Sequence, residues 1–84
     1  MGGTTDKGQL VNKVRELVHQ QLGIDLSELA DDKHFVDDYG ADSLDLTELV
    51  ITVEDEFGIS IPESELGDMN TVISIVNYIL QQQK

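Results

Sequence analysis

Cysteine is absent from this sequence of 84 residues. The chain can therefore form no disulfide, and it has no thiol of its own. Any sulfur chemistry would require a group supplied from outside the chain. A chain of this length supports one small domain at most.

Basic residues are scarce, since five lysines and arginines stand against 17 aspartates and glutamates, for a formal charge of −12. Such a charge argues against nucleic acid or an anionic membrane as partner, and it favours partners that present a basic patch. No lysine or arginine lies between His34 and Gln83. This acidic stretch has a simpler interpretation as well, in which its charges only keep the protein in solution. Its self-repulsion predicts that salt or divalent cations raise the melting temperature.

Long apolar runs are missing, and no basic start followed by an apolar stretch opens the chain. We therefore expect no membrane association and a cytoplasmic location. The two histidines, His19 and His34, lie far from any serine that could act as a nucleophile, and the acidic clusters do not have the spacing of a calcium loop. The sequence thus predicts no catalytic residues and no metal site.

Apolar residues recur at three- and four-residue steps in three stretches, which predicts amphipathic helices. The sequence predicts an all-α four-helix bundle, in which three helices are longer and the third in order is short. We expect residues 1–6 to form a flexible tail and residues 7–84 to form the domain. The expected helices span residues 7–22, 43–57, 62–66 and 71–82.

The ends of these helices carry recognisable capping residues. Gly23 and Gly58 follow the first two long helices, where a left-handed residue commonly ends a helix. Ser60 and Glu63 have the spacing of a capping box before the short helix, and Asn70 is predicted to cap the last one. Residues 24–42 should form a packed loop with one helical turn at 27–29.

The second long helix begins at a serine. Asp42 has the position of its N-cap and Asp45 the third helical position, so Ser43 is the first helical residue. Gly40 permits a tight backbone path into this helix. A helix N-terminus favours a phosphate, so a hydroxyl there suits a phosphodiester. Most Asp-Ser pairs before helices serve only as caps, however, and the local pattern leaves both readings open.

Residues 40–45 (Gly-Ala-Asp-Ser-Leu-Asp), followed by Glu-Leu-Val at 48–50 and Glu-Asp-Glu-Phe at 54–57, resemble the acyl carrier protein family. The resemblance extends from about residue 10 to residue 80. It includes Phe-Val-Asp-Asp at 35–38 and Ile-Ser-Ile-Pro-Glu at 59–63.

This resemblance implies that Ser43 carries a 4′-phosphopantetheine arm, which a phosphopantetheinyl transferase attaches from coenzyme A. Acyl intermediates would be held on the arm as thioesters and presented to enzymes of fatty acid, polyketide or related lipid biosynthesis. Expected partners are a ketosynthase, an acyltransferase and a reductase with basic docking patches, and we expect a monomer that is not itself an enzyme. The residues that match the family's docking surface are Asp42, Leu44, Asp45, Glu48, Ile51, Glu54 and Asp55.

Tyr39, Leu46 and Thr47 depart from the pattern usual in fatty-acid carriers, where leucine commonly precedes the glycine. The pathway and the acyl cargo therefore stay open. A second hypothesis also explains the charge and the helices: a non-catalytic acidic helical adaptor that binds a basic partner without a prosthetic group. A small hydrolase that uses Ser43 is disfavoured, because no base accompanies the serine.

Overall fold

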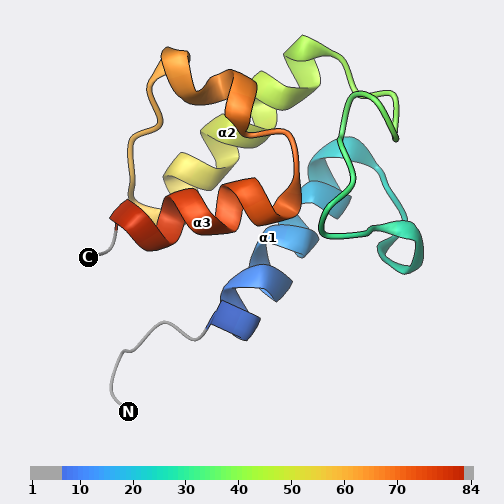
Figure 1. Ribbon diagram of the computed structural model, residues 1–84, viewed down its shortest axis with the longest axis horizontal. Coiled ribbons are helices and arrows are strands. Elements are labelled where there is room, and N and C mark those ends of the chain that lie inside the picture. Colours follow the sequence, from blue (N-terminus) through green and yellow to red (C-terminus); the bar gives the residue numbers. More distant parts are fainter. Residues whose placement is uncertain (1–6, 83–84) are drawn as a thin grey trace.

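The computed structural model describes residues 7–82, so the expected tail at residues 1–6 lies outside the described residues. Its regular elements are α1 (Lys7–Leu22), η1 (Leu26–Glu28), α2 (Ser43–Phe57), η2 (Glu63–Asp68) and α3 (Val72–Gln82), shown in Figure 1. The two η elements are short 3₁₀ helices, and the described range contains no strand. The predicted all-α class, with three longer helices and a short one before the last, is confirmed.

The core lies where the apolar stripes of the three α-helices meet, and α1 packs against both α2 and α3. Most stripe residues are buried as predicted, while Leu46 and Phe57 on α2 are only partly buried against the core edge. None of the helices in residues 7–82 combines the length and apolar character needed to cross a bilayer. The largest fully buried side chains are Phe35, Leu49, Ile75 and Ile79, with Val14, Val18, Val53, Val72 and Val76.

The first two long helices end as the sequence predicts. Gly23 has φ of +70° and its N–H donates to the His19 carbonyl at 2.9 Å. Gly58 has φ of +65° and its N–H donates to the Glu54 carbonyl at 2.9 Å. These positive φ values favour glycine, so both helices stop where the sequence places a residue without Cβ.

Two capping predictions after α2 are wrong. Pro62 has an extended backbone and precedes η2, and no side-chain hydrogen bond caps that element, so Ser60 and Glu63 form no capping box. Asn70 does not cap α3, because Thr71 Oγ1 accepts the Ser74 N–H at 3.0 Å in that role. The Asn70 side chain instead donates from Nδ2 to the Gly67 carbonyl at 2.8 Å. The Asn70 backbone carbonyl accepts the Phe35 N–H at 2.8 Å, which ties the loop to the start of α3.

The connection between α1 and α2 forms a lobe beside the bundle, at the right of Figure 1. Arg15 on α1 holds it through an ion pair with Asp31 at 2.6 Å and a hydrogen bond to the Leu26 carbonyl at 3.2 Å. The Asp31 carbonyl also accepts the Ile73 N–H at 3.1 Å. The predicted helical turn is present as η1, one residue earlier than expected, and the loop is packed as predicted.

Candidate functional site

The start of α2 carries the predicted serine on a reciprocal capping box. Asp42 Oδ1 accepts the Asp45 N–H at 2.9 Å, and Asp45 Oδ2 accepts the Asp42 N–H at 3.2 Å. Ser43 follows as the first helical residue, and its side chain is exposed. Its carbonyl accepts the Thr47 hydroxyl at 2.9 Å, whereas its own hydroxyl makes no hydrogen bond with a described residue. The capping box therefore fixes the backbone and leaves the hydroxyl free to react.

The chain reaches this helix through a turn anchored in the core. Phe35 is fully buried, and its carbonyl accepts the Ala41 N–H at 3.0 Å. The Gly40 N–H donates to the Val36 carbonyl at 3.0 Å, and Gly40 has φ of +76°, which favours glycine. The approach to Ser43 is thus held by backbone hydrogen bonds to Phe35 itself and to the next residue, Val36.

Two exposed apolar residues, Leu44 and Ile51, alternate with two exposed acids, Glu48 and Asp55, on one face of α2. The spacing of four, three and four residues places them on neighbouring turns of one helix face. Leu44 is 64% exposed and Ile51 is 52% exposed, the highest values among the large apolar residues of the described range. We call these four residues the exposed stripe. It begins at the residue that follows Ser43.

The remaining predicted docking residues have other contacts. Asp42 is exposed and Asp45 half-buried, and each uses one carboxylate oxygen in the capping box. Glu54 is half-buried, and its Oε2 accepts the Ile61 N–H at 2.6 Å. Glu54 therefore fastens the connection after α2 to the helix.

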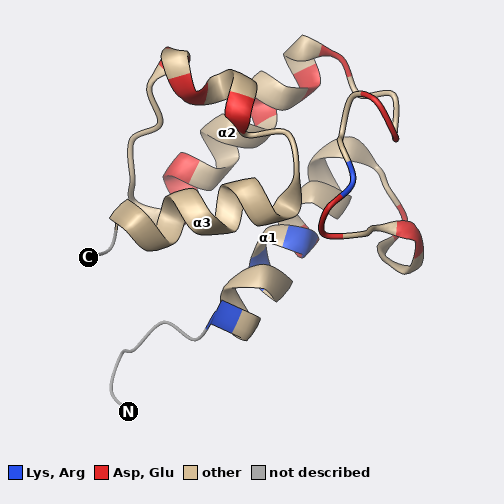
Figure 2. Cartoon of the chain, in the orientation of Figure 1, with Lys and Arg blue, Asp and Glu red and all other residues tan. Residues whose placement is uncertain are grey.

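Charge is divided between the elements of the described range (Figure 2). Apart from Glu16 on α1, the acids lie on α2, η2 and the loop, whereas the basic residues lie on α1 and at Lys33 in the loop. Lys13 pairs with Glu56 at 3.0 Å, and this hydrogen bond raises the pKa of the Lys13 ammonium. The ion pair links α1 to the end of α2 remote from Ser43, so the surface around the serine keeps its acidic character.

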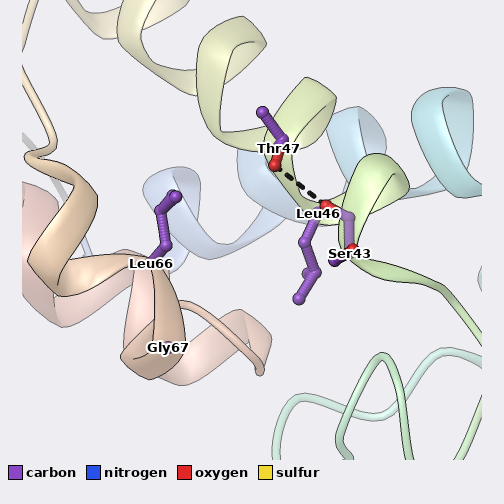
Figure 3. Close-up of a pocket in the computed structure, with 5 residues that line it drawn as sticks. All are labelled: Ser43, Leu46, Thr47, Leu66 and Gly67. Carbon is purple, nitrogen blue, oxygen red and sulfur yellow. Dashed lines mark hydrogen bonds between the residues drawn. The ribbon is translucent and has the colours of Figure 1, made fainter.

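A groove of about 220 Å³ opens beside the serine between α2 and η2. Figure 3 shows Leu46 and Leu66 facing this opening from the two elements. The spacing of Leu46 and Thr47 from Ser43 could have identified two of its lining residues. No local sequence pattern predicts that Leu66 and Gly67 line the groove, because the tertiary fold alone places η2 next to α2. The lining residues are Ser43, Leu46, Thr47, Leu66 and Gly67.

Neither histidine serves Ser43. His19 Nδ1 lies 2.7 Å from the Ile24 carbonyl oxygen at the end of α1, and His34 Nδ1 lies 3.5 Å from Asp37 Oδ2. Within residues 7–82 no group of histidine, aspartate and glutamate side chains has the arrangement of a metal site. The site therefore offers a free hydroxyl and an apolar groove, and no adjacent base that could activate the hydroxyl.

Tyr39 contributes contacts that the sequence did not predict. Its hydroxyl accepts the Ala30 N–H at 2.8 Å and donates to the Glu28 carbonyl at 3.0 Å. These bonds join the η1 region to the turn that precedes Ser43. The aromatic ring is partly buried against the core.

Comparison with known proteins identifies the family to which this chain is similar. The family described as "Phosphopantetheine attachment site" (PP-binding) matches residues 12–79. An acyl carrier protein of Cyanidioschyzon merolae is 42% identical over 76 residues, which cover 90% of this chain and 84% of that protein. An acyl carrier protein of Clostridium acetobutylicum is 45% identical over 67 residues, which cover 80% of this chain and 87% of that protein.

A solved structure shows the same fold. It is the solution structure of the apo doublet acyl carrier protein from prodigiosin biosynthesis, with a TM-score of 0.78 and 30% sequence identity. The match covers 93% of this chain and 38% of that longer chain. The family match, the two relatives and this fold agree, so the predicted 4′-phosphopantetheine cofactor and carrier role are confirmed. The chain therefore belongs to the acyl carrier protein family, whose members carry acyl groups on a 4′-phosphopantetheine arm.

Proposed function

We propose that Ser43 is the residue to which the 4′-phosphopantetheine arm is attached. The observation that carries this proposal is the exposed, unbonded hydroxyl at the first position of a capped helix. Residue 43 lies within the matched range 12–79. The capping box supports the role, since it holds the backbone of Ser43 in place without engaging its side chain.

The residues around Ser43 fit a phosphodiester. The N–H groups of Ser43 and Leu44 belong to the first helical turn, where backbone donors have no partner within the helix and the helix dipole favours an anion. Asp42 and Asp45 oppose deprotonation of the serine, so the transferase must supply the base. When bound, the prosthetic group supplies a flexible arm whose terminal thiol holds acyl chains as thioesters. Leu46 and Leu66 would give apolar contacts to a chain tethered at Ser43.

The exposed stripe supports docking to acyl-processing enzymes. Apolar side chains flanked by carboxylates complement a partner surface with an apolar centre and a basic rim. Asp42 and Asp45 extend this surface to Ser43. Glu54 belongs to the predicted docking set, but one of its oxygens is committed to the Ile61 N–H, as one oxygen of Asp42 and of Asp45 is to the capping box, so we expect these three to contribute less than Glu48 and Asp55.

We infer the following context from the family and the charge. Residues 7–84 act as one carrier domain, a monomer in the cytoplasm that carries acyl groups and catalyses no reaction. Its partners are a phosphopantetheinyl transferase and enzymes such as a ketosynthase, an acyltransferase and a reductase, rather than nucleic acid or a membrane. The acyl groups belong to fatty acid, polyketide or related lipid biosynthesis.

Loading the purified chain tests the attachment site. The apo protein is incubated with coenzyme A, Mg²⁺ and a phosphopantetheinyl transferase, and its intact mass is measured. We expect one phosphopantetheine adduct on the wild type and on Ser64→Ala, a matched control that removes an exposed serine of η2. Ser43→Ala should gain no adduct. An adduct that persists in Ser43→Ala would place the arm elsewhere and overturn the proposal.

A further inference from the structure

The loop between α1 and α2 consists of two halves that the hydroxyl of Tyr39 joins. The first half, residues 24–33, is held to α1 by Arg15 and to α3 by the Ile73 N–H. The second half, residues 34–42, turns around the buried Phe35. In the described range, the only hydrogen bonds that directly join the two halves are those of Tyr39 to Ala30 and Glu28.

The phenol is well placed for this role, because it uses both of its hydrogen-bonding capacities at once. It accepts from the Ala30 N–H at 2.8 Å and donates to the Glu28 carbonyl at 3.0 Å, on either side of the buried Leu29. Tyr39 precedes Gly40, and Ser43 follows four residues after Tyr39. The hydroxyl therefore fixes the backbone of residues 28–30 against the segment that leads into the proposed attachment site.

We propose that Tyr39 is a positioning residue that orders residues 28–30 beside the approach to Ser43, so that the transferase meets a preformed surface. The inference rests on the proposed function of Ser43. A segment that is ordered before docking loses less conformational freedom on docking, and this strengthens binding. The ordered segment also carries the exposed Glu28, and the exposed Asp32 follows it; their charges add to the acidic surface that attracts a basic partner, whereas Asp31 is paired with Arg15.

The hydroxyl acts on docking and leaves the chemistry at Ser43 unchanged. Tyr39→Phe keeps the ring against the core, and the capping box around Ser43 does not involve the tyrosine. Loss of hydrogen bonds of this kind corresponds to a rise of about threefold to tenfold in KM for the carrier in the transferase reaction. We expect kcat to stay within about twofold of the wild type, since no interaction made only in the transition state is removed.

Tyr78→Phe is the matched control. Tyr78 on α3 donates its hydroxyl to the Ser60 carbonyl at 3.2 Å, in the connection between α2 and η2. This variant also loses one phenol hydroxyl bonded to a backbone carbonyl, but away from the loop. It should keep the wild-type KM. Tyr39→Leu, which retains an apolar side chain without a hydroxyl, should raise KM as Tyr39→Phe does.

The experiment measures kcat and KM for loading of the wild type and these three variants, together with amide hydrogen exchange and circular dichroism. We expect exchange of the Ala30 amide to be faster by about tenfold in the Tyr39 variants only, with helical content retained. An unchanged KM in a folded Tyr39 variant, or an equal rise in Tyr78→Phe, overturns the inference. If the wild type takes no arm at Ser43, the proposed function fails and this inference falls with it. Normal loading of the wild type with an unchanged KM in Tyr39→Phe refutes the role of Tyr39 alone.

Discussion

Replacing Glu54 with alanine should lower the stability of the fold, although it removes charge from a strongly acidic chain. Glu54 lies near the C-terminal end of α2, where the helix dipole disfavours a carboxylate. Its Oε2 accepts the Ile61 N–H at 2.6 Å, and the side chain of Ile61 is buried in the core. Loss of the carboxylate would leave that N–H without its partner and free the connection that leads to η2.

The size of the effect follows from the hydrogen bond. Hydrogen bonds to charged groups contribute about 1.5–3 kcal/mol, and because water can partly replace this half-buried carboxylate we expect a loss of about 1–2 kcal/mol. In a domain of this size the loss lowers the melting temperature by about 4–15 °C. Asp55→Ala is the control, because its exposed carboxylate has no hydrogen bond or ion pair with a described residue. Its effect should stay within about 0.5 kcal/mol.

Thermal and urea unfolding followed by circular dichroism would measure both variants. Each variant loses one negative charge near the same helix end, so relief of charge repulsion is similar in both. The difference between them therefore reports the Ile61 contact. The reasoning is refuted if the two variants unfold at the same temperature, or if Glu54→Ala is more stable than the wild type.

Three further measurements test other parts of the fold and surface. Asp42→Ala removes the N-cap of α2 and should cost about 1 kcal/mol in urea unfolding, whereas Asp42→Asn, which can still accept the Asp45 N–H, should recover most of that loss. Phe35→Ala empties a fully buried position and should cost about 3–5 kcal/mol, and a smaller loss on calorimetry would show that the loop anchor is dispensable. Added NaCl or Mg²⁺ should raise the melting temperature, because the chain carries a formal charge of −12 and cations screen its self-repulsion; a melting temperature indifferent to both would contradict this.

The sequence was sufficient for the parts of the fold that depend on local chemistry. The C-terminal ends of α1 and α2 follow from helical periodicity and from glycines that adopt positive φ at Gly23 and Gly58, and the start of α2 follows from its N-cap. The capping box of Asp42 and Asp45 is likewise local, since its partners lie three residues apart. The exposed position of Ser43 follows from that cap. These features needed no knowledge of the rest of the chain.

The features that escaped sequence reasoning depend on residues distant in the chain. Asn70 is a local exception, because its side-chain Nδ2 donates to the Gly67 carbonyl and the neighbouring Thr71 caps α3. Leu66 lines the groove beside Ser43 because the tertiary fold places η2 against α2. The Tyr39 hydroxyl finds its partners nine and eleven residues earlier, a separation that no helical or turn pattern encodes. Local capping and periodicity therefore predict elements, whereas tertiary hydrogen bonds decide how the loop and the groove are built.

The structure divides the acids of α2 by physical role, although the sequence groups them as one docking surface. Asp42 and Asp45 close the capping box, and Glu54 holds the Ile61 N–H, so each commits at least one oxygen to the fold. The two acids of the exposed stripe, Glu48 and Asp55, make no such side-chain bond with a described residue. Their charges are free for a partner, and they alternate with the most exposed apolar residues of the described range. A basic partner can therefore engage the stripe beside Ser43 without displacing any contact that stabilises the helix.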